Sequence, residues 1–453
     1  MKSGEKKSGE TIFFSIPFSS ARGGLEIAVA DAAAEISKFS RPRLFTASRF
    51  LKEEFRARKI PAHRIFLEKI NPVSKLSILF FPFSAISIFL PGFFILLFAK
   101  LRGARRAVFV NFAEKILLAP LAQLLNFQTF FLEHETPRRW FRRNPFLPFY
   151  KFAARRATVI FPSQFLRDEF LKICPNLKTG ILPNKVEPEF SGVSWRAARK
   201  VLDLSSRKIF EKNKTVFPEK NSQNFLSGIR VTNSDREKTQ TPDNFSAKNF
   251  RGDTKENIAR GKIENENVAR GSFFNFQKKI WFGFAGRFSE EKNLEKLIAT
   301  FFELQKMRDD FILILAGGDS ISRQKLIQKI PPEIRGRIFL PGFLHGEKLR
   351  DFFCALDFFL LFSKFESFSI AAVEALFYGK PILCAPVGVL PEIIRENENG
   401  FFLNLENSPT EIAAKIDAIL RGENWREMEF FARKSVQKFS AKNFANRVRE
   451  IFA

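Results

Sequence analysis

The feature that most constrains the fold is an alternation of short strand-like runs with helical runs, which occurs in two series along the chain. The first series has strand-like runs at 11–17, 107–112, 128–132 and 158–161. The second has them at 280–285, 311–315, 337–340, 358–361, 381–384 and 401–403. Strands that alternate with helices at this spacing favour parallel sheets covered by helices. The sequence therefore predicts an α/β protein with two Rossmann-like domains.

A polar segment separates the two series. Residues 191–277 are rich in Asn, Lys, Glu and Ser and contain few aliphatic side chains. Such a segment cannot bury enough apolar surface to offset the entropy lost on ordering. We expect an N-terminal domain at 11–190, a largely disordered insertion at 191–277, a C-terminal domain at 278–438, and a final helix at 439–453 that is a candidate to pack back on the N-terminal domain.

The charge of the chain limits the partners that it attracts. Its 74 Lys and Arg outnumber its 48 Asp and Glu, which gives a formal net charge of +26. This charge favours polyanions such as nucleic acid, anionic lipid or phosphate-bearing substrates. No base-reading motif is present, so no nucleic-acid partner is expected. The three histidines and three cysteines match no metal-ligand or disulfide spacing, which predicts no metal site and buried thiols in a reducing compartment.

An uncharged apolar run at 76–99 has three interpretations. It is followed by a basic collar of Lys100, Arg102, Arg105 and Arg106, and its length is sufficient to cross a bilayer. Pro82, Pro91 and Gly92 interrupt it, however. The run can be a helix buried in or docked on the first domain, an in-plane helix in contact with a membrane, or a transmembrane span, in that order of preference.

Two pairs of charged residues in the second domain are candidates to bind a nucleotide. Arg287 follows a strand and Lys292 lies at a helix start, an arrangement that suits a diphosphate. Glu366 and Glu374 lie eight residues apart, or about 12 Å of helical rise, and could hold the two ends of a nucleotide sugar. The first pair could instead belong to a surface salt bridge, and the second could be two solvated glutamates on a helix. Neither pair alone therefore decides the function.

The order of these motifs resembles that of the family-4 glycosyltransferases, which have the GT-B fold. The resemblance spans 280–420 and includes Gly286-Arg287, Glu291-Lys292-Asn293, Ala316-Gly317-Gly318, Leu340-Pro341-Gly342, the run from Glu366 to Ala375, Gly379-Lys380-Pro381 and Gly388-Val389-Leu390-Pro391-Glu392. The first domain matches more loosely, at Arg22-Gly23-Gly24-Leu25-Glu26, Glu133-His134-Glu135, Pro162-Ser163 and Leu182-Pro183-Asn184. Two positions depart from the family pattern, Ser367 and Lys185, where the family often has glycine.

The resemblance implies a role for each matched residue. Arg287 and Lys292 would bind the donor diphosphate, Glu374 the ribose, and Glu366 the donor sugar. His134 would lie over the donor sugar at the point of transfer, although a packing histidine is the alternative. Further donor-binding residues implied by the match are Gly23, Gly24, Gly317, Gly342, Ser367, Phe368, Ser369 and Ile370.

The resemblance also implies the reaction, which is transfer of a sugar from a nucleotide sugar with retention of the anomeric configuration. The nucleotide sugar is a substrate, and neither a cofactor nor a metal is expected, since no Asp-x-Asp motif occurs. The charge and the 76–99 run favour a glycan or lipid-linked saccharide acceptor at an anionic membrane surface, on its cytoplasmic face. The alternatives are a nucleotide-sugar epimerase of the same fold, a basic nucleic-acid-binding protein and an inactive membrane scaffold.

Overall fold

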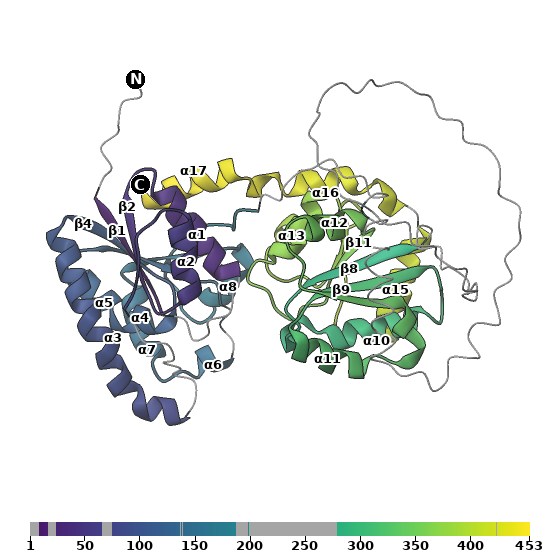
Figure 1. The fold of residues 1–453 in the computed structure, drawn as a ribbon, viewed down its shortest axis with the longest axis horizontal. Coiled ribbons are helices and arrows are strands. Elements are labelled where there is room, and N and C mark those ends of the chain that lie inside the picture. Colours follow the sequence, from purple (N-terminus) through teal and green to yellow (C-terminus); the bar gives the residue numbers. More distant parts are fainter. Residues whose placement is uncertain are drawn as a thin grey trace, which may run out of the picture.

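The computed structural model describes residues 9–16, 24–65, 75–135, 137, 139–186, 198, 279–422 and 424–453 (Figure 1). The side chains of 75–84, 139 and 140 are not part of this description. The predicted insertion at 191–277 lies outside the described residues except for Ala198, and Gly23 of the first loop also lies outside them.

Within the described residues, the N-terminal domain contains a seven-stranded parallel sheet with the order β3-β2-β1-β4-β5-β6-β7. Its strands are β1 (Glu10–Ser15), β2 (Arg41–Thr46), β3 (Ala62–Arg64), β4 (Ala104–Phe109), β5 (Gln128–Leu132), β6 (Ala157–Phe161) and β7 (Lys178–Ile181). Its helices are α1 (Gly24–Ile36), α2 (Arg49–Ala57), α3 (Lys75–Leu101), α4 (Phe112–Leu117), α5 (Ala119–Leu124), α6 (Arg139–Arg142), α7 (Leu147–Ala154) and α8 (Gln164–Leu171).

The C-terminal domain contains a six-stranded parallel sheet in the described residues, with the order β10-β9-β8-β11-β12-β13. Its strands are β8 (Ile280–Gly286), β9 (Phe311–Gly317), β10 (Ile338–Gly342), β11 (Phe358–Leu361), β12 (Ile382–Cys384) and β13 (Gly400–Phe402). Its α-helices are α10 (Leu294–Leu304), α11 (Ser320–Lys329), α12 (Glu347–Ala355), α13 (Ile370–Phe377), α14 (Leu390–Ile393), α15 (Pro409–Arg421) and α16 (Glu429–Ser435). Short 3-10 helices are η2 (Glu290–Lys292), η3 (Pro332–Arg337), η4 (Asn424–Glu427) and η5 (Gln437–Phe439).

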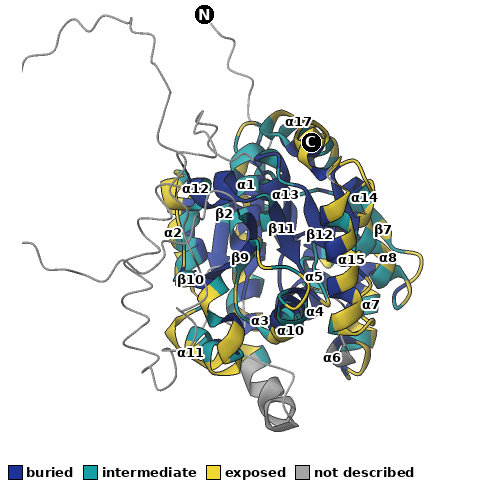
Figure 2. Ribbon diagram, turned by 90° about the vertical axis from the view of Figure 1, so that its right-hand side faces the viewer, coloured by how far each residue is buried: buried dark blue, intermediate teal, exposed yellow. Residues whose placement is uncertain are grey.

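Both sheets are buried on their two faces, as expected for parallel strands covered by helices (Figure 2). In β1, Ile12 and Phe14 belong to one core cluster and Phe13 to the cluster on the opposite face. The three free cysteines are all buried, as predicted. The two-domain α/β architecture deduced from the alternation of strands and helices is thus confirmed.

Two similar sequences, at 47–55 and 162–170, both begin a helix that is capped by serine. Ser48 accepts a hydrogen bond from the backbone of Leu51 at the start of α2, and Ser163 accepts one from Leu166 at the start of α8.

The strand expected at 107–112 was misplaced. The observed strand β4 begins three residues earlier and includes Arg105 and Arg106. Arg106 is buried because its guanidinium donates to the backbone carbonyl of Ala453, 2.7 Å away, at the end of the chain. A local sequence pattern cannot reveal a partner so distant in sequence. The two arginines therefore led us to place the start of the strand too late.

The apolar run at 76–99 forms one continuous helix, α3, despite Pro82, Pro91 and Gly92. Gly92 lies where α3 crosses Leu118: a Cβ atom at this position would lie 2.4 Å from a methyl carbon of Leu118. The helix packs on β4, α4 and α5, so it is docked on the first domain. Among the helices of the described residues, none has the length and apolarity needed to cross a membrane.

The last helix, α17 (Ala441–Phe452), leaves the C-terminal domain and packs on α1 of the N-terminal domain (Figure 1). Phe444, Val448 and Phe452 are buried in the core cluster that also contains Phe130 of β5. The rings of Phe130 and Phe452 lie 4.6 Å apart. The helix therefore links the two domains through an apolar contact.

Replacing Phe452 with alanine should reduce the stability of the N-terminal domain. The ring is almost completely buried, so its removal leaves a cavity at a cost of about 3–5 kcal/mol. The same change at Phe430, which is exposed on α16, is the matched control and should cost less than about 0.5 kcal/mol. Denaturant unfolding measures both, and equal losses in the two variants would contradict the structural role of α17.

Candidate functional site

The candidate site begins at the point where the strand order of the C-terminal sheet reverses, between β8 and β11. Open parallel sheets bind ligands outside the carboxyl ends of strands at such a switch point. Lys292 follows β8, Glu366 follows β11, and Lys292 Nζ lies 2.6 Å from Glu366 Oε1. The structure thus brings together two of the residues selected from the sequence.

Glu366 is held in place from two directions. Ser363 donates a hydrogen bond to the same oxygen, Oε1, over 2.7 Å, and the side chains of Lys292 and Glu366 are only 17% and 10% exposed. Both contacts use Oε1, so within the described residues Oε2 is left to accept a hydrogen bond from a ligand. Ser363 was not identified from the sequence, because a serine after a strand carries no distinctive signal.

Arg287 lies at the end of β8 and is far more accessible than Lys292. Its side chain is 66% exposed, and its guanidinium lies 4.0 Å from Glu291, the outer limit of an ion pair. The guanidinium is therefore accessible to an anionic ligand.

The start of α13 has an unusual backbone. Ser369, the N-cap residue, has φ +82°, a left-handed conformation that is costly for a residue other than glycine. The Ser367 carbonyl accepts a hydrogen bond from Ser163 of the N-terminal domain, 2.8 Å away, and the Phe368 ring packs against Phe439. The side chain of Phe368 is therefore structural, so at this residue only the backbone is available to a ligand.

Glu374 lies further along the same helix. Burial raises the pKa of its carboxyl group to about 7. In the part of the chain that the structure describes, no hydrogen bond or ion pair offsets this effect. A buried carboxylate without donors is a suitable acceptor for ligand hydroxyl groups.

The glycines selected from the sequence lie where a positive φ or a close neighbour disfavours a side chain. Gly317 has φ +120°, and a Cβ atom there would lie 1.9 Å from the carbonyl oxygen of Gly286 in the neighbouring strand. Gly342 has φ +83° and lies close to Arg323. Gly388 was matched by the family pattern but not selected as a site residue; a Cβ atom there would lie 2.9 Å from Cβ of Glu366. These glycines permit the close packing of backbone around the site.

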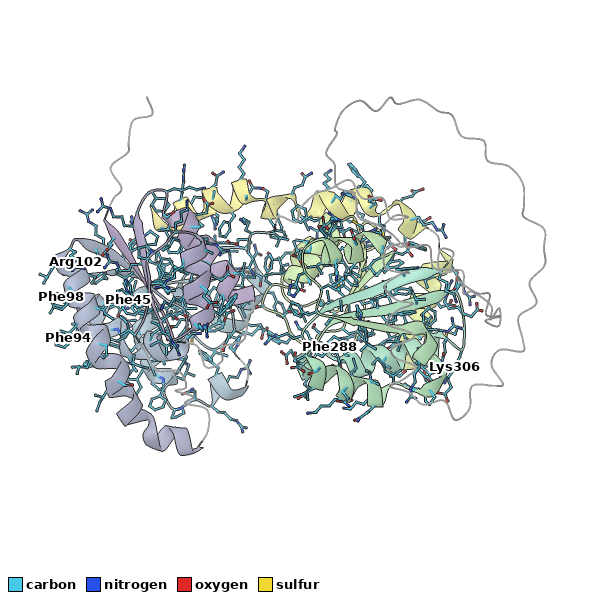
Figure 3. The ribbon with its side chains drawn as sticks, viewed as in Figure 1. Phe45, Phe94, Phe98, Arg102, Phe288 and Lys306 are labelled. Carbon is cyan, nitrogen blue, oxygen red and sulfur yellow. The ribbon has the colours of Figure 1, made fainter. Side chains whose placement is uncertain are left out.

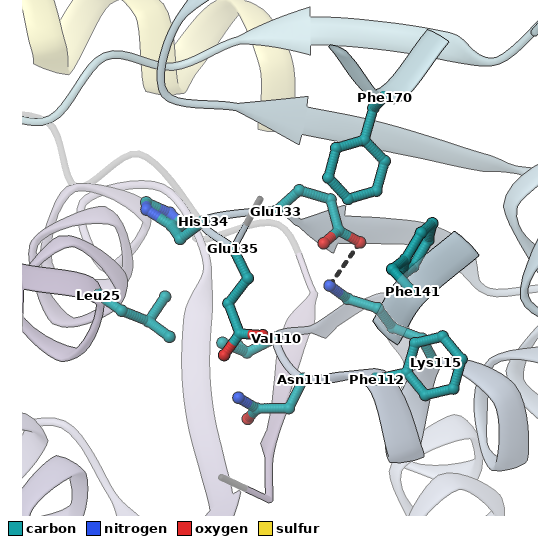
Figure 4. Close-up of a pocket in the computed structure, with 10 residues that line it drawn as sticks. All are labelled: Leu25, Val110, Asn111, Phe112, Lys115, Glu133, His134, Glu135, Phe141 and Phe170. Atoms are coloured by element: carbon teal, nitrogen blue, oxygen red, sulfur yellow. Dashed lines mark hydrogen bonds and ion pairs between the residues drawn. The ribbon is translucent and has the colours of Figure 1, made fainter. Parts of the chain in front are cut away.

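A second cluster of polar residues lies in the N-terminal domain around His134 (Figure 4). Lys115 of α4 forms a buried ion pair with Glu133, with 2.6 Å between Nζ and Oε1, and Tyr150 donates to the same oxygen over 2.8 Å. These residues line or adjoin a recess with an empty volume of about 430 Å³. Burial and the nearby Lys115 lower the pKa of His134 to about 3, so its imidazole is neutral at physiological pH.

The same arrangement of a glutamate at a switch point occurs between β1 and β4. Glu114 is fully buried, and its Oε1 accepts hydrogen bonds from the backbone of Asn111 and Ile16. Burial raises its pKa to about 7, and its Oε2 has no hydrogen-bond partner in the described residues. Sequence reasoning missed Glu114 and Lys115; the available signal was two adjacent charges inside an otherwise apolar helical run.

The two clusters meet at the start of α1. A Cβ atom on Gly24 would lie 2.8 Å from Cδ1 of Ile370 at the start of α13, and Leu25 lines the recess that contains His134. Glu392 of α14 also accepts a hydrogen bond from the backbone of Gln164, 2.8 Å away, across the domain boundary. The carboxyl ends of the two sheets therefore face each other, with His134 and the α13 helix start on either side of α1.

No group of His, Cys, Asp and Glu in the described residues has the arrangement of a metal site.

Comparison with known proteins agrees with this architecture. Residues 266–434 match the family model described as glycosyl transferases group 1. The chain is 26% identical over 176 residues to a lipopolysaccharide 1,2-N-acetylglucosaminetransferase of Salmonella typhimurium. The matched region covers 37% of this chain and 46% of the relative. It is 30% identical over 151 residues to a GDP-mannose-dependent alpha-mannosyltransferase of Corynebacterium glutamicum. This matched region covers 33% of this chain and 34% of the relative.

These sequence matches span less than half the length of the curated relatives. The structural similarity extends further. The crystal structure of Anabaena Alr3699/HepE in complex with UDP superposes with a TM-score of 0.66 over 98% of this chain and 99% of that chain, at 15% sequence identity. Residues 266–434 thus resemble the glycosyl transferases group 1 family, and the two facing domains of the chain have the GT-B fold.

Proposed function

We propose that this protein is a retaining glycosyltransferase that moves a sugar from a nucleotide-sugar donor to a glycan or lipid-linked saccharide. The observation that carries the proposal is the site at β8, β11 and α13, where Lys292 and Glu366 are paired at the switch point and Glu374 lies in the helix that follows. Cations, a helix start and two carboxylates are the groups that a nucleotide sugar requires.

Each group has a distinct task in this proposal. Arg287 and Lys292 bind the diphosphate, together with backbone amides at the start of α13. Glu374 accepts hydrogen bonds from the ribose, and Glu366 Oε2 accepts them from the donor sugar. The left-handed Ser369 presents the backbone at the start of α13 to the donor.

The reaction follows from the charge that develops during bond cleavage. The bond between the anomeric carbon and the diphosphate oxygen breaks, the acceptor oxygen bonds to that carbon from the same face, and the acceptor proton passes to the departing diphosphate. Arg287, Lys292 and the helix dipole stabilise the negative charge on the leaving group, so the proposed reaction uses neither a metal nor a cofactor. Neutral His134 donates or accepts a hydrogen bond near the sugar without adding charge to the site.

The relatives support a nucleotide-sugar donor without selecting its base. One relative is named for GDP-mannose, and the structural neighbour was solved with UDP and, in a further crystal, with UDP-glucose. The name of the Salmonella relative supports a cell-envelope glycan as acceptor. The net charge of +26 and the basic collar after α3 favour a peripheral position on an anionic membrane, on its cytoplasmic face.

Alanine at Lys292 or at Glu374 should lower the kcat/KM for glycosyl transfer by about 100-fold or more, since each change removes a side chain proposed to bind the donor. Thermal-shift screening against UDP-, GDP-, ADP- and dTDP-sugars identifies the donor for the assay. Lys306→Ala and Glu303→Ala, which remove an exposed ion pair on and after α10, are matched controls. Near-normal turnover in both site variants would exclude this site.

Donor affinity should depend on pH through Glu374. The carboxylate must be charged to accept from ribose, and its pKa in the empty site is about 7. Protonation therefore competes with the donor, and the donor Kd should rise about fivefold between pH 7 and pH 6. Calorimetric titration at several pH values measures this change, which should be largely absent in Glu374→Gln. An unchanged pH dependence in that variant would assign the effect to another group.

The proposed retention of the anomeric configuration can be tested directly. NMR of the first product formed should show the same anomeric configuration as the donor sugar. Product with the inverted configuration would contradict the proposed same-face attack and leave the donor site itself unaffected.

A further inference from the structure

A second recess lies on the N-terminal domain, away from the cleft between the two sheets. It lies between α3 and the strands β1, β2 and β3. The labelled positions in Figure 3 place Phe45, Phe94, Phe98 and Arg102 together on the side of the domain opposite the C-terminal domain. The lining residues that carry the following argument are Arg43, Phe45, His63, Phe94, Phe98 and Arg102.

The recess exists because α3 covers only part of the sheet. The helix packs on β4, α4 and α5, whereas α1 and α2 pack on the opposite face of β2. On the face of α3, the strands beyond β1 present Phe45 and His63, whose rings stack 5.3 Å apart. These stacked rings form the aromatic surface of the recess between the sheet and the helix.

The lining of this recess carries a net positive charge. Arg43 and Arg102 line it, and the pKa of His63 is lowered by burial and by the charges of Arg43, Lys52 and Arg56. The acidic lining residue is Glu10, which is already paired with Arg43 over 2.7 Å. The recess therefore combines an apolar interior with the guanidinium groups of Arg43 and Arg102, and Arg102 is the exposed residue of the two.

An exposed apolar stripe leads along α3 to the recess. Ile86, Leu90, Phe94 and Phe98 are all exposed and follow one another at intervals of four residues, which places them on one face of the helix. Leu101 is also exposed at the end of the helix, next to Arg102. Apolar side chains bordered by arginines match the interface between the acyl chains and the anionic headgroups of a membrane.

We propose that this recess binds one acyl chain of an anionic membrane lipid, with the lipid phosphate held by Arg43 and Arg102. The acyl chain lies on Phe45 and between Phe94 and Phe98, and the remainder of the α3 stripe rests on the membrane surface. The site is separate from the donor site, so the proposal does not depend on the sugar-transfer reaction.

A short-chain lipid tests the recess without a membrane. The purified full-length protein is titrated by calorimetry with dihexanoyl phosphatidylglycerol below its micelle-forming concentration. We expect saturable binding with one lipid per chain. Dihexanoyl phosphatidylcholine, which carries no net charge, should bind at least about tenfold more weakly, and glycerol phosphate, which lacks acyl chains, should also bind at least about tenfold more weakly.

Two exposed positions provide variants that should fold normally. Arg102→Glu should weaken phosphatidylglycerol binding by about tenfold or more, because it replaces an attraction to the phosphate with a repulsion. Phe98→Ser should weaken it by removing an aromatic wall of the recess. Phe149→Ser on α7 is the matched control, since Phe149 is similarly exposed but does not line the recess. Donor binding should be unchanged in all three variants.

Several results would overturn the proposal. Equal affinity for the two lipids would show that the site does not select an anionic headgroup. Glycerol phosphate that binds as tightly as the lipid would show an anion site without an acyl site. Absence of binding would rule out the lipid site. A concentration-dependent dimer that disappears in Phe98→Ser would show that a second copy of the chain covers the recess instead.

Discussion

The ion pair between Lys292 and Glu366 is the interaction around which the candidate donor site is organised. It joins the segments that follow β8 and β11, the two strands at which the order of the C-terminal sheet reverses. Ser363 and the close approach of Gly388 then determine where Glu366 lies, and the backbone of the Glu366 segment leads directly into α13. The direction of this helix sets where Glu374 and the helix start lie relative to the ion pair. Loss of the ion pair would therefore shift the candidate donor site as a whole.

The N-terminal domain repeats this organisation with different chemistry. Glu114 links the segments after β1 and β4, again at the point where the strand order reverses, but its partners are backbone amides and not a lysine. The lysine next to it in sequence, Lys115, pairs instead with Glu133 beside His134. The carboxyl ends of the two sheets thus differ in chemistry. At the C-terminal sheet the exposed Arg287 lies near the paired Lys292, and at the N-terminal sheet a neutral imidazole lies next to a charge pair that is already satisfied.

Contacts between the domains explain why these halves face each other. Gly24 approaches Ile370, Ser163 donates to the Ser367 carbonyl, and α17 carries the end of the chain back to the first domain. Two of these three contacts involve the segment 367–370, which is also the helix start proposed to bind the donor phosphates. In the proposed donor complex, the donor and the first domain therefore contact the same stretch of backbone.

The sequence by itself determined the two α/β domains, most strand positions in the second domain, and the chemistry of Arg287, Lys292, Glu366 and Glu374. Periodicity and helix caps are local properties, and motif order is preserved along the chain, so both can be read without a structure. Tertiary structure alone decided that Lys292 pairs with Glu366, that Glu114 and Lys115 are buried at the cleft, that Arg106 is satisfied by the chain end, and that α3 continues through its prolines. These features depend on residues far apart in sequence, whose burial and pairing arise only when the sheets and helices pack together.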